Sequence, residues 1–226
     1  MPSSRSTSPP SPAPSPAPSP APRGADRRPT RKGDVQREAL LGAMTRLLER
    51  KRFGDLSVAD ITTEAGVARS GFYFYFESKY AALGSASVDI WSEFVDATDS
   101  YVRPEGESVS DYVTRVLQNA LRIWRSHEAL LIASLEALPL DEDLTRAWRE
   151  QIGRVSDLVA QQVERDRAAG LVAPGFGDVP ALVRRLGETT MYLLYQDRSD
   201  KSDDAASEQT VEVLKHLWLS AMGART

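Results

Sequence analysis

The chain has 226 residues, of which 41% are hydrophobic and 27% are charged, enough for one large globular domain or two small ones that share a core. It contains no cysteine, which excludes disulfide and thiolate chemistry and predicts a cytoplasmic location. It has neither an apolar run near the roughly 20 residues of a membrane span nor an apolar signal-peptide segment at the N-terminus.

The net charge of −4 is divided unevenly along the chain. Residues 1–32 hold six basic residues and one acidic residue, a net +5, whereas residues 33–95 carry −2 and the remainder carries −7. The positive charge is therefore concentrated at one end, and the acidic remainder would discourage DNA from binding elsewhere.

The N-terminal segment has two parts. Residues 1–22 are a Ser/Pro/Ala repeat with almost no apolar bulk, which predicts disorder with some polyproline II. A basic arm follows at 23–32; by itself it is a solvated tail, but beside a DNA-binding motif we expect it to contact phosphates or the minor groove. The arm residues expected at DNA are Arg27, Arg28, Arg31 and Lys32.

Three helices are predicted between residues 34 and 76. The first, over 34–52, has apolar residues at helical spacing. The second, over 57–64, begins with Ser57 as its N-cap and has Asp60 three residues on, as a capping pair requires. Gly66 can adopt the positive φ of a tight turn, and the third helix follows at once over 69–76. This spacing is that of a helix-turn-helix.

The third helix contains five consecutive aromatic residues, 72–76, which cannot all face one core. Phe72 and Phe76 form the predicted buried pair, while Ser70 and Phe74 point the opposite way. A core helix with one misplaced aromatic is the alternative, but the preceding helix and turn favour a helix that lies against DNA. The residues expected at DNA are Ser57, Arg69, Ser70, Gly71, Tyr73, Phe74, Tyr75 and Lys79.

The rest of the chain is predicted to be helical over 78–99, 108–126, 128–136, 141–169, 178–196 and 205–222, with no strand pattern. We therefore predict an all-α fold of about nine helices. A three-helix DNA-binding domain occupies 33–94, and a larger effector-binding and dimerisation domain occupies 95–226. The last two helices are apolar on two sides, which a four-helix bundle with the same pair from a second copy would bury. A homodimer is therefore expected.

Aromatic residues lie on four helices of the larger domain, opposite small residues, and predict an apolar chamber for a small molecule; ordinary core is the alternative. The residues expected to bind this molecule are Leu121, Trp124, Trp148, Ile152, Val155, Gly187, Thr190, Tyr192, Tyr195 and Trp218.

Metal and catalytic sites are not expected. The only histidines are His127 and His216, and neither has acidic or histidine partners at ligand spacing. The sequence has no Gly-rich phosphate loop and no nucleophile elbow. We therefore predict neither an enzyme nor a bound cofactor.

The run from Ser57 through Ala65-Gly66-Val67 to the aromatic stretch and Ser78-Lys79 resembles the signature of the TetR family of bacterial transcriptional regulators. Within that family it is similar to the mycobacterial repressors of ethionamide activation. The resemblance implies a homodimeric repressor that binds an inverted-repeat DNA operator and is released by a small apolar or amphipathic effector. It also implies that a ligand tunnel is lined by Trp148, Tyr192 and Trp218.

Some positions depart from the family pattern. Ala68 and Gly71 stand where the family commonly has a capping serine and a backbone-contacting threonine, each a hydrogen bond worth about 1 kcal/mol. These two departures keep open an alternative function, a helical small-molecule carrier or sensor without DNA binding. Arg184 and Gly187 stand where the similar repressors have polar pocket amides. The polar ligand contacts expected here are Thr189, Thr190 and Arg184.

Overall fold

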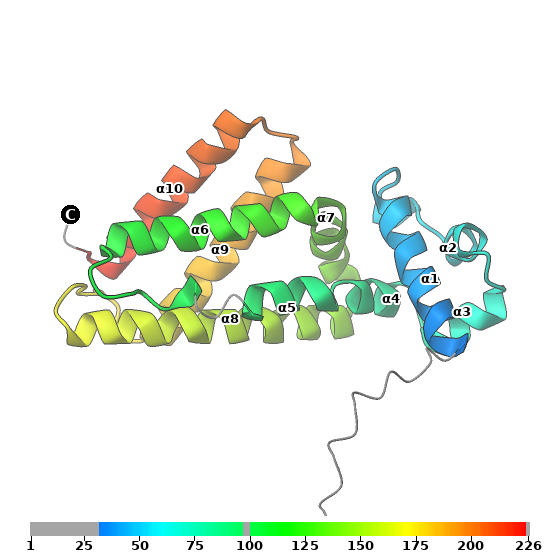
Figure 1. Ribbon diagram of the computed structural model, residues 1–226, viewed down its shortest axis with the longest axis horizontal. Coiled ribbons are helices and arrows are strands. Elements are labelled where there is room, and N and C mark those ends of the chain that lie inside the picture. The colour runs from blue at the N-terminus through cyan, green and yellow to red at the C-terminus, as the bar shows by residue number, and fades with distance from the viewer. Residues whose placement is uncertain (1–31, 97–99, 225–226) are drawn as a thin grey trace, which may run out of the picture.

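The computed structural model describes residues 32–96 and 100–224, and within these ranges all regular structure is helical and no strand is present (Figure 1). The described residues form ten α-helices, with 3₁₀ turns η1 (Phe53–Asp55) and η3 (Leu138–Leu140) between them. The all-α prediction is confirmed.

The N-terminal end contains α1 (Lys32–Leu48), α2 (Val58–Ala65) and α3 (Arg69–Tyr75). The first helix ends at Leu48 rather than at the predicted residue 52, because the chain turns there into η1. Leu40, Met44 and Ile61 are almost fully buried where α1 and α2 pack together. The three helices stand at one end of the molecule, where α1 also packs against α4 and α7 (Figure 1).

The predicted helix over 78–99 is two helices, α4 (Lys79–Ala86) and α5 (Val88–Asp96), separated at Ser87. The Ser87 hydroxyl donates to the carbonyl of Leu83 at 3.0 Å and lies 3.2 Å from the hydroxyl of Ser134. Counting α4 and α5 as one helix gives the predicted nine. The first of them packs against α1 and also against α7 and α8, and the second packs against α6 and α8, so α4 contacts both the N-terminal helices and the larger body.

The larger body consists of α6 (Val109–Ser126), α7 (Glu128–Ala137), α8 (Glu142–Ala168), α9 (Val179–Ser199) and α10 (Asp204–Met222). Figure 1 shows α5 and α8 along one side, α6, α9 and α10 on the other, and α7 at the end that faces α1. Buried side chains of all these helices form one core with those of the N-terminal end.

Most helices begin at a side chain that the sequence marks as a cap. A side-chain oxygen accepts a hydrogen bond from the backbone N–H three residues on at Ser57, Ser78, Ser108, Asp141, Asp178 and Asp203. These donors would otherwise be unpaired at a helix start, so the caps fix the boundaries.

The last two helices are apolar on two sides, as predicted, and this chain buries only one of them. On α10, Leu214 is 1% exposed, whereas Val213 and Leu217 are 50% and 43% exposed. On α9, Leu194 is fully buried and Tyr192 is 54% exposed. An exposed apolar face therefore remains on this helix pair.

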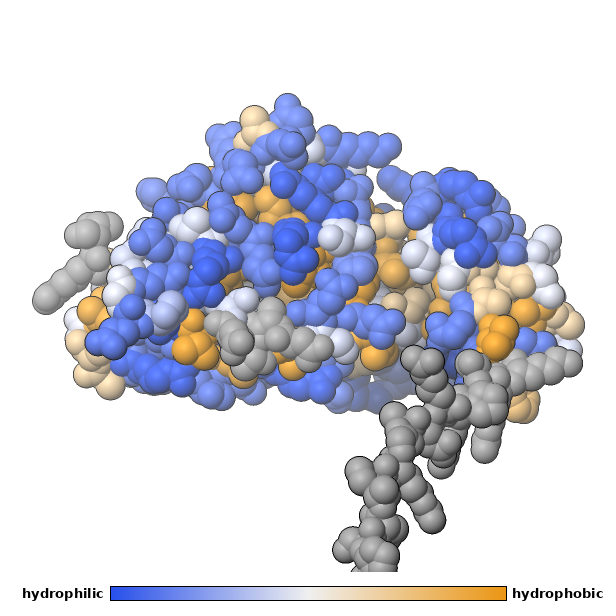
Figure 2. Space-filling model, viewed as in Figure 1, coloured by the Kyte–Doolittle hydropathy of each residue, from blue (hydrophilic) through white to orange (hydrophobic). Residues whose placement is uncertain are grey.

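No described helix is long and apolar enough to cross a membrane. Within the described ranges, no cluster of three or more His, Asp or Glu residues is positioned to hold a metal ion. The visible surface of the body is mostly hydrophilic, whereas hydrophobic residues gather at the end formed by α1 to α3 (Figure 2).

Candidate functional site

The start of α2 is held by a reciprocal pair of hydrogen bonds. The backbone N–H of Asp60 donates to Ser57 Oγ at 3.1 Å, and the backbone N–H of Ser57 donates to Asp60 Oδ2 at 2.9 Å. These bonds, the Ser57 hydroxyl and Lys51 lower the pKa of Asp60 to about 2, the Ser57 hydroxyl having the largest effect. At the other end, Gly66 has φ of 65°, so the predicted capping box and turn are both present.

The third helix divides its aromatic residues as predicted. Phe72 and Phe76 are 0% and 4% exposed, and their ring centroids lie 5.5 Å apart. Tyr73 is 50% exposed and Phe74 is 80% exposed. Exposing so large an apolar ring costs free energy, so this face is suited to contact with a partner.

The turn between α2 and α3 explains Gly71. A Cβ atom at this position would lie 2.8 Å from Val67 Cγ1, too close for two carbon atoms. Glycine therefore lets α3 approach the turn closely. Ala68, at the N-cap of α3, provides no side-chain hydrogen bond, in agreement with the sequence.

Two further aromatic contacts orient α3. The Arg69 guanidinium lies 5.8 Å from the centroid of the Tyr73 ring, and its Nη2 is 3.5 Å from the Tyr73 hydroxyl. The Tyr75 hydroxyl donates to Gln36 Oε1 at 3.4 Å, and a Cβ on Gly33 would lie 3.3 Å from the same hydroxyl. Tyr75 therefore packs against the first turns of α1 as well as flanking the exposed face.

The ammonium group of Lys79 is turned toward the protein. Its Nζ donates to the carbonyl oxygens of Phe53, Gly54 and Leu56 at 3.0, 3.4 and 2.8 Å. An ammonium group has three N–H donors, so all three are used. The phosphate contact predicted for Lys79 requires these bonds to open, and its observed role is to hold η1 against the start of α4.

Among the arm residues predicted at DNA, Arg27, Arg28 and Arg31 lie outside the described residues. Lys32 is the first residue of α1, whose N-terminal end lies beside α3 (Figure 1). The last residue of the arm therefore lies at the end of α1 that is beside α3.

An apolar cavity of about 60 Å³ lies inside the larger body. Its walls come from α5, the α5–α6 connection, α6, α8, α9 and α10, and none of the lining residues is charged. The lining residues are Trp91, Phe94, Tyr101, Val116, Leu117, Ala120, Ile152, Val155, Ser156, Val159, Val183, Gly187, Thr190, Met191 and Trp218. Known small-molecule sites span roughly 300–1,000 Å³, so a ligand must enlarge this cavity to enter.

Half of the residues predicted to bind a ligand line this cavity: Ile152, Val155, Gly187, Thr190 and Trp218. Leu121 and Trp124 are buried in the core but do not line it. Tyr192 and Tyr195 do not line it either, and the half-exposed Tyr192 accepts a hydrogen bond from Gln196 at 2.7 Å on the outer face of α9.

Trp148 lies at the boundary between two spaces. It lines a neighbouring groove of about 340 Å³ between α4, α5 and the start of α8, and Trp91 lines both this groove and the cavity. The two indole rings meet edge to face with centroids 4.7 Å apart. Trp91 therefore lies between the groove and the cavity, with Trp148 packed against it on the groove side.

The polar residues predicted to orient a ligand are already occupied. The Thr190 hydroxyl accepts from the Trp218 indole at 3.0 Å and donates to the Leu186 carbonyl at 2.8 Å. Thr189 is exposed and donates to the Arg185 carbonyl. The Arg184 guanidinium lies on the surface, 3.9 Å from Asp157. Thr189 and Arg184 do not line the cavity, and the hydroxyl of Thr190, which does line it, is already paired.

Two residues that the sequence prediction missed provide polar groups there. Ser156 and Tyr101 are each 4% exposed and line the cavity. Neither side-chain hydroxyl has a hydrogen-bond partner among the described residues. Burial raises the pKa of Tyr101 to about 12, so this hydroxyl stays protonated at neutral pH.

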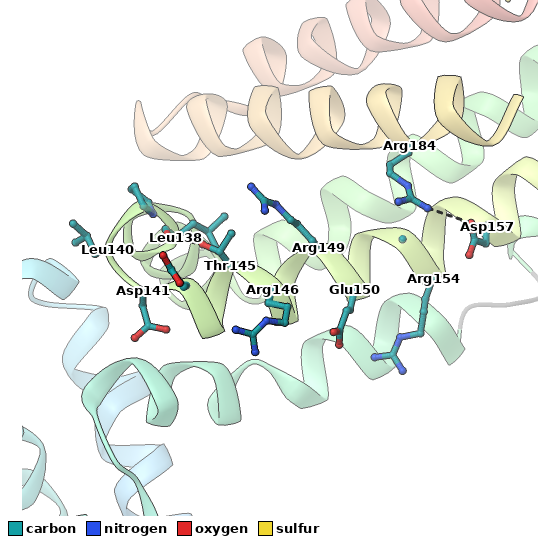
Figure 3. A pocket seen from close by; sticks show the side chains of 13 residues that line it. Leu138, Leu140, Asp141, Thr145, Arg146, Arg149, Glu150, Arg154, Asp157 and Arg184 are labelled. Atoms are coloured by element: carbon teal, nitrogen blue, oxygen red, sulfur yellow. Dashed lines mark hydrogen bonds and ion pairs between the residues drawn. The ribbon is translucent and has the colours of Figure 1, made fainter. Parts of the chain in front are cut away.

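A further hollow, of about 1,240 Å³, is an open polar groove along η3, α8 and α9 (Figure 3). Arg146, Arg149 and Arg154 project from α8 among the carboxylates of Glu150 and Asp157. Its walls carry both signs of charge and lie open to solvent, unlike the enclosed apolar cavity. The groove therefore has no chemistry that would select one small apolar ligand.

Comparison with protein families matches residues 40–84 to the bacterial regulatory proteins of the tetR family and residues 113–223 to the C-terminal domain of the transcriptional regulator EthR. The HTH-type transcriptional regulator EthR of Mycolicibacterium smegmatis is 30% identical over 198 residues, covering 84% of this chain and 87% of that protein. EthR of Mycobacterium tuberculosis (strain H37Rv) is 25% identical over 203 residues, covering 84% and 88%. Among solved structures, FadR of Bacillus subtilis in complex with stearoyl-CoA has the same fold, with a TM-score of 0.63 at 18% identity over 78% of this chain and 96% of that one.

Proposed function

Because this chain belongs to the TetR family of transcriptional regulators and is EthR-like, we propose that it is a homodimeric repressor that a small apolar effector releases from its operator. The observation that carries the proposal is the connection between an exposed aromatic helix and an apolar cavity through α4 and α5.

The exposed face of α3 enters the major groove. Phe74 and Tyr73 are large, exposed and held on a helix whose other face is buried, so they can be presented without rearrangement. Apolar side chains in the major groove contact the methyl group of thymine, and Arg69 and Ser70 are placed for base edges or phosphates. The half-site is therefore expected to contain thymine opposite Phe74.

The basic arm extends this contact. It joins the structure beside α3, and it carries the positive charge that the rest of the chain lacks. Arg27, Arg28, Arg31 and Lys32 contact phosphates or the minor groove next to the half-site.

The exposed apolar face of α9 and α10 forms the dimer interface. Tyr192, Val213 and Leu217 would be buried against the same residues of a second copy, in a four-helix bundle. Two copies related by a two-fold axis present two α3 helices to an inverted repeat, whose half-sites lie one DNA turn, about 34 Å, apart.

Release follows from the position of α5. Trp91 and Phe94 of α5 line the cavity, so a ligand that enlarges the cavity displaces this helix. The helix is interrupted at Ser87. At the start of α4, Lys79 Nζ donates hydrogen bonds to the carbonyl oxygens of Phe53 in η1 and of Leu56 just after it. A shift of α5 is therefore passed through α4 to the helix-turn-helix and changes the separation of the two α3 helices in the dimer.

The test is a footprint of the purified protein on the DNA upstream of its own gene, at about 50–100 mM salt, where phosphate contacts are strong. We expect protection of an inverted repeat, and loss of protection when an effector fills the cavity. Without residues 1–32, the slope of log K against log salt should flatten by about 3.6, the value for roughly four phosphate contacts. A protein that binds apolar molecules but protects no DNA would instead be the carrier or sensor without DNA binding.

A further inference from the structure

The cavity combines apolar walls with two hydroxyl groups that lack partners. Buried polar groups in proteins are almost always hydrogen-bonded, because an unpaired one keeps the cost of leaving water. Ser156 and Tyr101 are more than nine-tenths buried, and both line the cavity. Trp124 Nε1 is a fully enclosed side-chain atom without a partner, but Trp124 does not line the cavity. The hydroxyl oxygens of Ser156 and Tyr101 are not among the fully enclosed atoms, so each keeps some accessible surface for a ligand.

The surroundings of Ser156 leave its hydroxyl accessible. This residue lies in α8 opposite Gly187 of α9, and a Cβ atom on Gly187 would lie 3.2 Å from Ser156 Oγ. Any larger side chain at position 187 would cover the hydroxyl or displace it. The glycine therefore keeps open the space in front of the only hydroxyl that α8 gives to the cavity.

The backbone that carries Tyr101 is fixed from three sides. The Tyr112 hydroxyl donates to the Tyr101 carbonyl at 3.1 Å, and the backbone N–H of Arg103 donates to Gln162 at 3.2 Å. The Arg103 guanidinium forms a largely buried ion pair with Asp166, with 2.8 Å between Nη2 and Oδ1. Because the segment is held in this way, the Tyr101 ring is a fixed part of the cavity wall.

Resting on the proposed function of this cavity as the effector site, we propose that the effector is a neutral, mostly hydrocarbon molecule with a carbonyl-type oxygen that accepts hydrogen bonds from Ser156 and Tyr101. Both hydroxyls can donate, and the Thr190 and Trp218 polar groups are already paired with each other. The absence of charged residues among the lining residues disfavours a carboxylate or an ammonium group, because either would lose its hydration without gaining a counter-charge.

The test uses three eight- or nine-carbon probes and the full chain without DNA. The probes are 2-octanone, its hydrocarbon isostere 2-methyl-1-octene, and octanoate. Dissociation constants are measured from tryptophan fluorescence, since Trp91 and Trp218 line the cavity. We expect the ketone to bind about tenfold tighter than the alkene, the effect of one or two net hydrogen bonds, and octanoate to bind more weakly than the ketone.

The matched variants are Ser156→Ala, Tyr101→Phe and the double variant. In the double variant the preference for ketone over alkene should fall below about twofold, while the alkene affinity is retained. The unliganded variants should melt at the same temperature as the parent chain or higher, because each loses a buried polar group that had no partner.

Three results would overturn the proposal: a preference for the ketone that persists in the double variant, tightest binding of the alkene or octanoate, or no binding of any probe. A lower melting temperature of the double variant would do the same, since it would show that the hydroxyls are structural. Because no DNA is present, a failure to bind an operator would leave these results unchanged and would count only against the proposed repressor function.

Discussion

The two ends of the molecule leave opposite kinds of group without a partner. In the helix-turn-helix, the polar groups pair with one another, as Ser57 does with Asp60 and Lys79 does with three carbonyls, while Phe74 lies exposed. In the cavity the walls are mostly apolar, and the hydroxyls of Ser156 and Tyr101 have no hydrogen-bond partner among the described residues. Each end therefore presents the group that its proposed partner would satisfy.

The two ends also differ in rigidity: the helix-turn-helix is held rigidly, whereas the cavity has to change shape. The helix-turn-helix is fixed by caps and ion pairs, including Glu64, which accepts from both Arg46 and Arg50 and whose pKa is lowered chiefly by the Arg46 hydrogen bond. The cavity must expand to hold a ligand, and α5 forms part of its wall. A break in the helix at Ser87 separates α5 from α4. A stiff DNA-reading end joined to an expandable chamber is the arrangement that a ligand-controlled regulator requires.

The largest effect is expected from Lys79→Met, which tests whether the Lys79 hydrogen bonds stabilise the helix-turn-helix end of the molecule. Removing the ammonium group leaves the carbonyls of Phe53, Gly54 and Leu56 without their donor. Hydrogen bonds to a charged group contribute about 2 kcal/mol, so the free energy of unfolding measured in urea should fall by about that amount.

The matched control is Lys51→Met. Lys51 bonds only to Asp60, with 44% of its side chain exposed, and such pairs contribute less than about 1 kcal/mol. If the Lys79 variant kept its stability and lost affinity for DNA instead, its ammonium group would be a phosphate contact after all, as the sequence suggested.

Phe74→Ala should come next and should act only on DNA binding. The ring is 80% exposed and supports no core contact, so stability should change by less than about 0.5 kcal/mol. Losing one good base contact costs about 1–3 kcal/mol, so operator affinity measured by gel shift should fall about tenfold or more.

A matched control for Phe74 is Phe176→Ala. Phe176 is also a phenylalanine at the surface, 56% exposed, but it lies between α8 and α9, far along the chain from the helix-turn-helix. Equal losses of DNA affinity in the two variants would mean that exposed aromatic rings act through stability or solubility, and the comparison between the two ends would fail.

The helix-turn-helix was predictable because its determinants are local. Ser57 and Asp60, or Phe72 and Phe76, are three or four residues apart, and helical spacing alone fixes their relation. The interruption at Ser87 was missed because the apolar spacing continues across it, and the hydroxyl that accompanies the break is next to Ser134, 47 residues away.

The cavity was predicted only in kind, because its residues are selected by long-range packing. Tyr192 and Tyr195 have the right composition for a chamber wall, but the rotation of α9 places them outside the lining. Ser156 gave no signal, since a serine in a helix is usually satisfied by a carbonyl one turn back. Its hydroxyl lies opposite Gly187 of α9, a contact between helices that the sequence does not reveal.

The acid limit of stability tests the capping box. The folded-state pKa of Asp60, about 2, lies below its ordinary value of 3.8, so the carboxylate contributes stability that is present above about pH 4 and is lost as the pH falls toward 2. Ser57→Ala removes the largest cause of this lowered pKa. It should reduce the free energy of unfolding by about 1 kcal/mol at pH 7 and by less near pH 3.

The control for this pH dependence is Ser78→Ala. Ser78 caps α4 by accepting from the backbone N–H of Ala81 at 3.1 Å, with no carboxylate in the pair. Its cost, also about 1 kcal/mol, should therefore be the same at pH 7 and pH 3. If both variants lost the same fraction of their effect on acidification, the Ser57 result would reflect general acid denaturation rather than the capping box.

The smallest effect is expected at Gly71, and it tests whether glycine is needed there for packing against Val67 or for close approach of the DNA backbone. Alanine in a helix is about 1 kcal/mol more favourable than glycine, but here its Cβ would lie 2.8 Å from Val67 Cγ1. Val67 is β-branched, so the methyl group cannot move away without a change of rotamer. Gly71→Ala alone should therefore leave the free energy of unfolding unchanged or slightly lower, whereas in a Val67→Ala background it should stabilise the protein by about 0.5–1 kcal/mol.

This coupling is measured by urea unfolding of the parent chain, the two single variants and the double variant. The operator affinity of the double variant then shows whether the added methyl group at position 71 affects DNA binding. Equal effects of Gly71→Ala in both backgrounds would remove the packing explanation and leave close approach of the DNA backbone as the reason for glycine at this position.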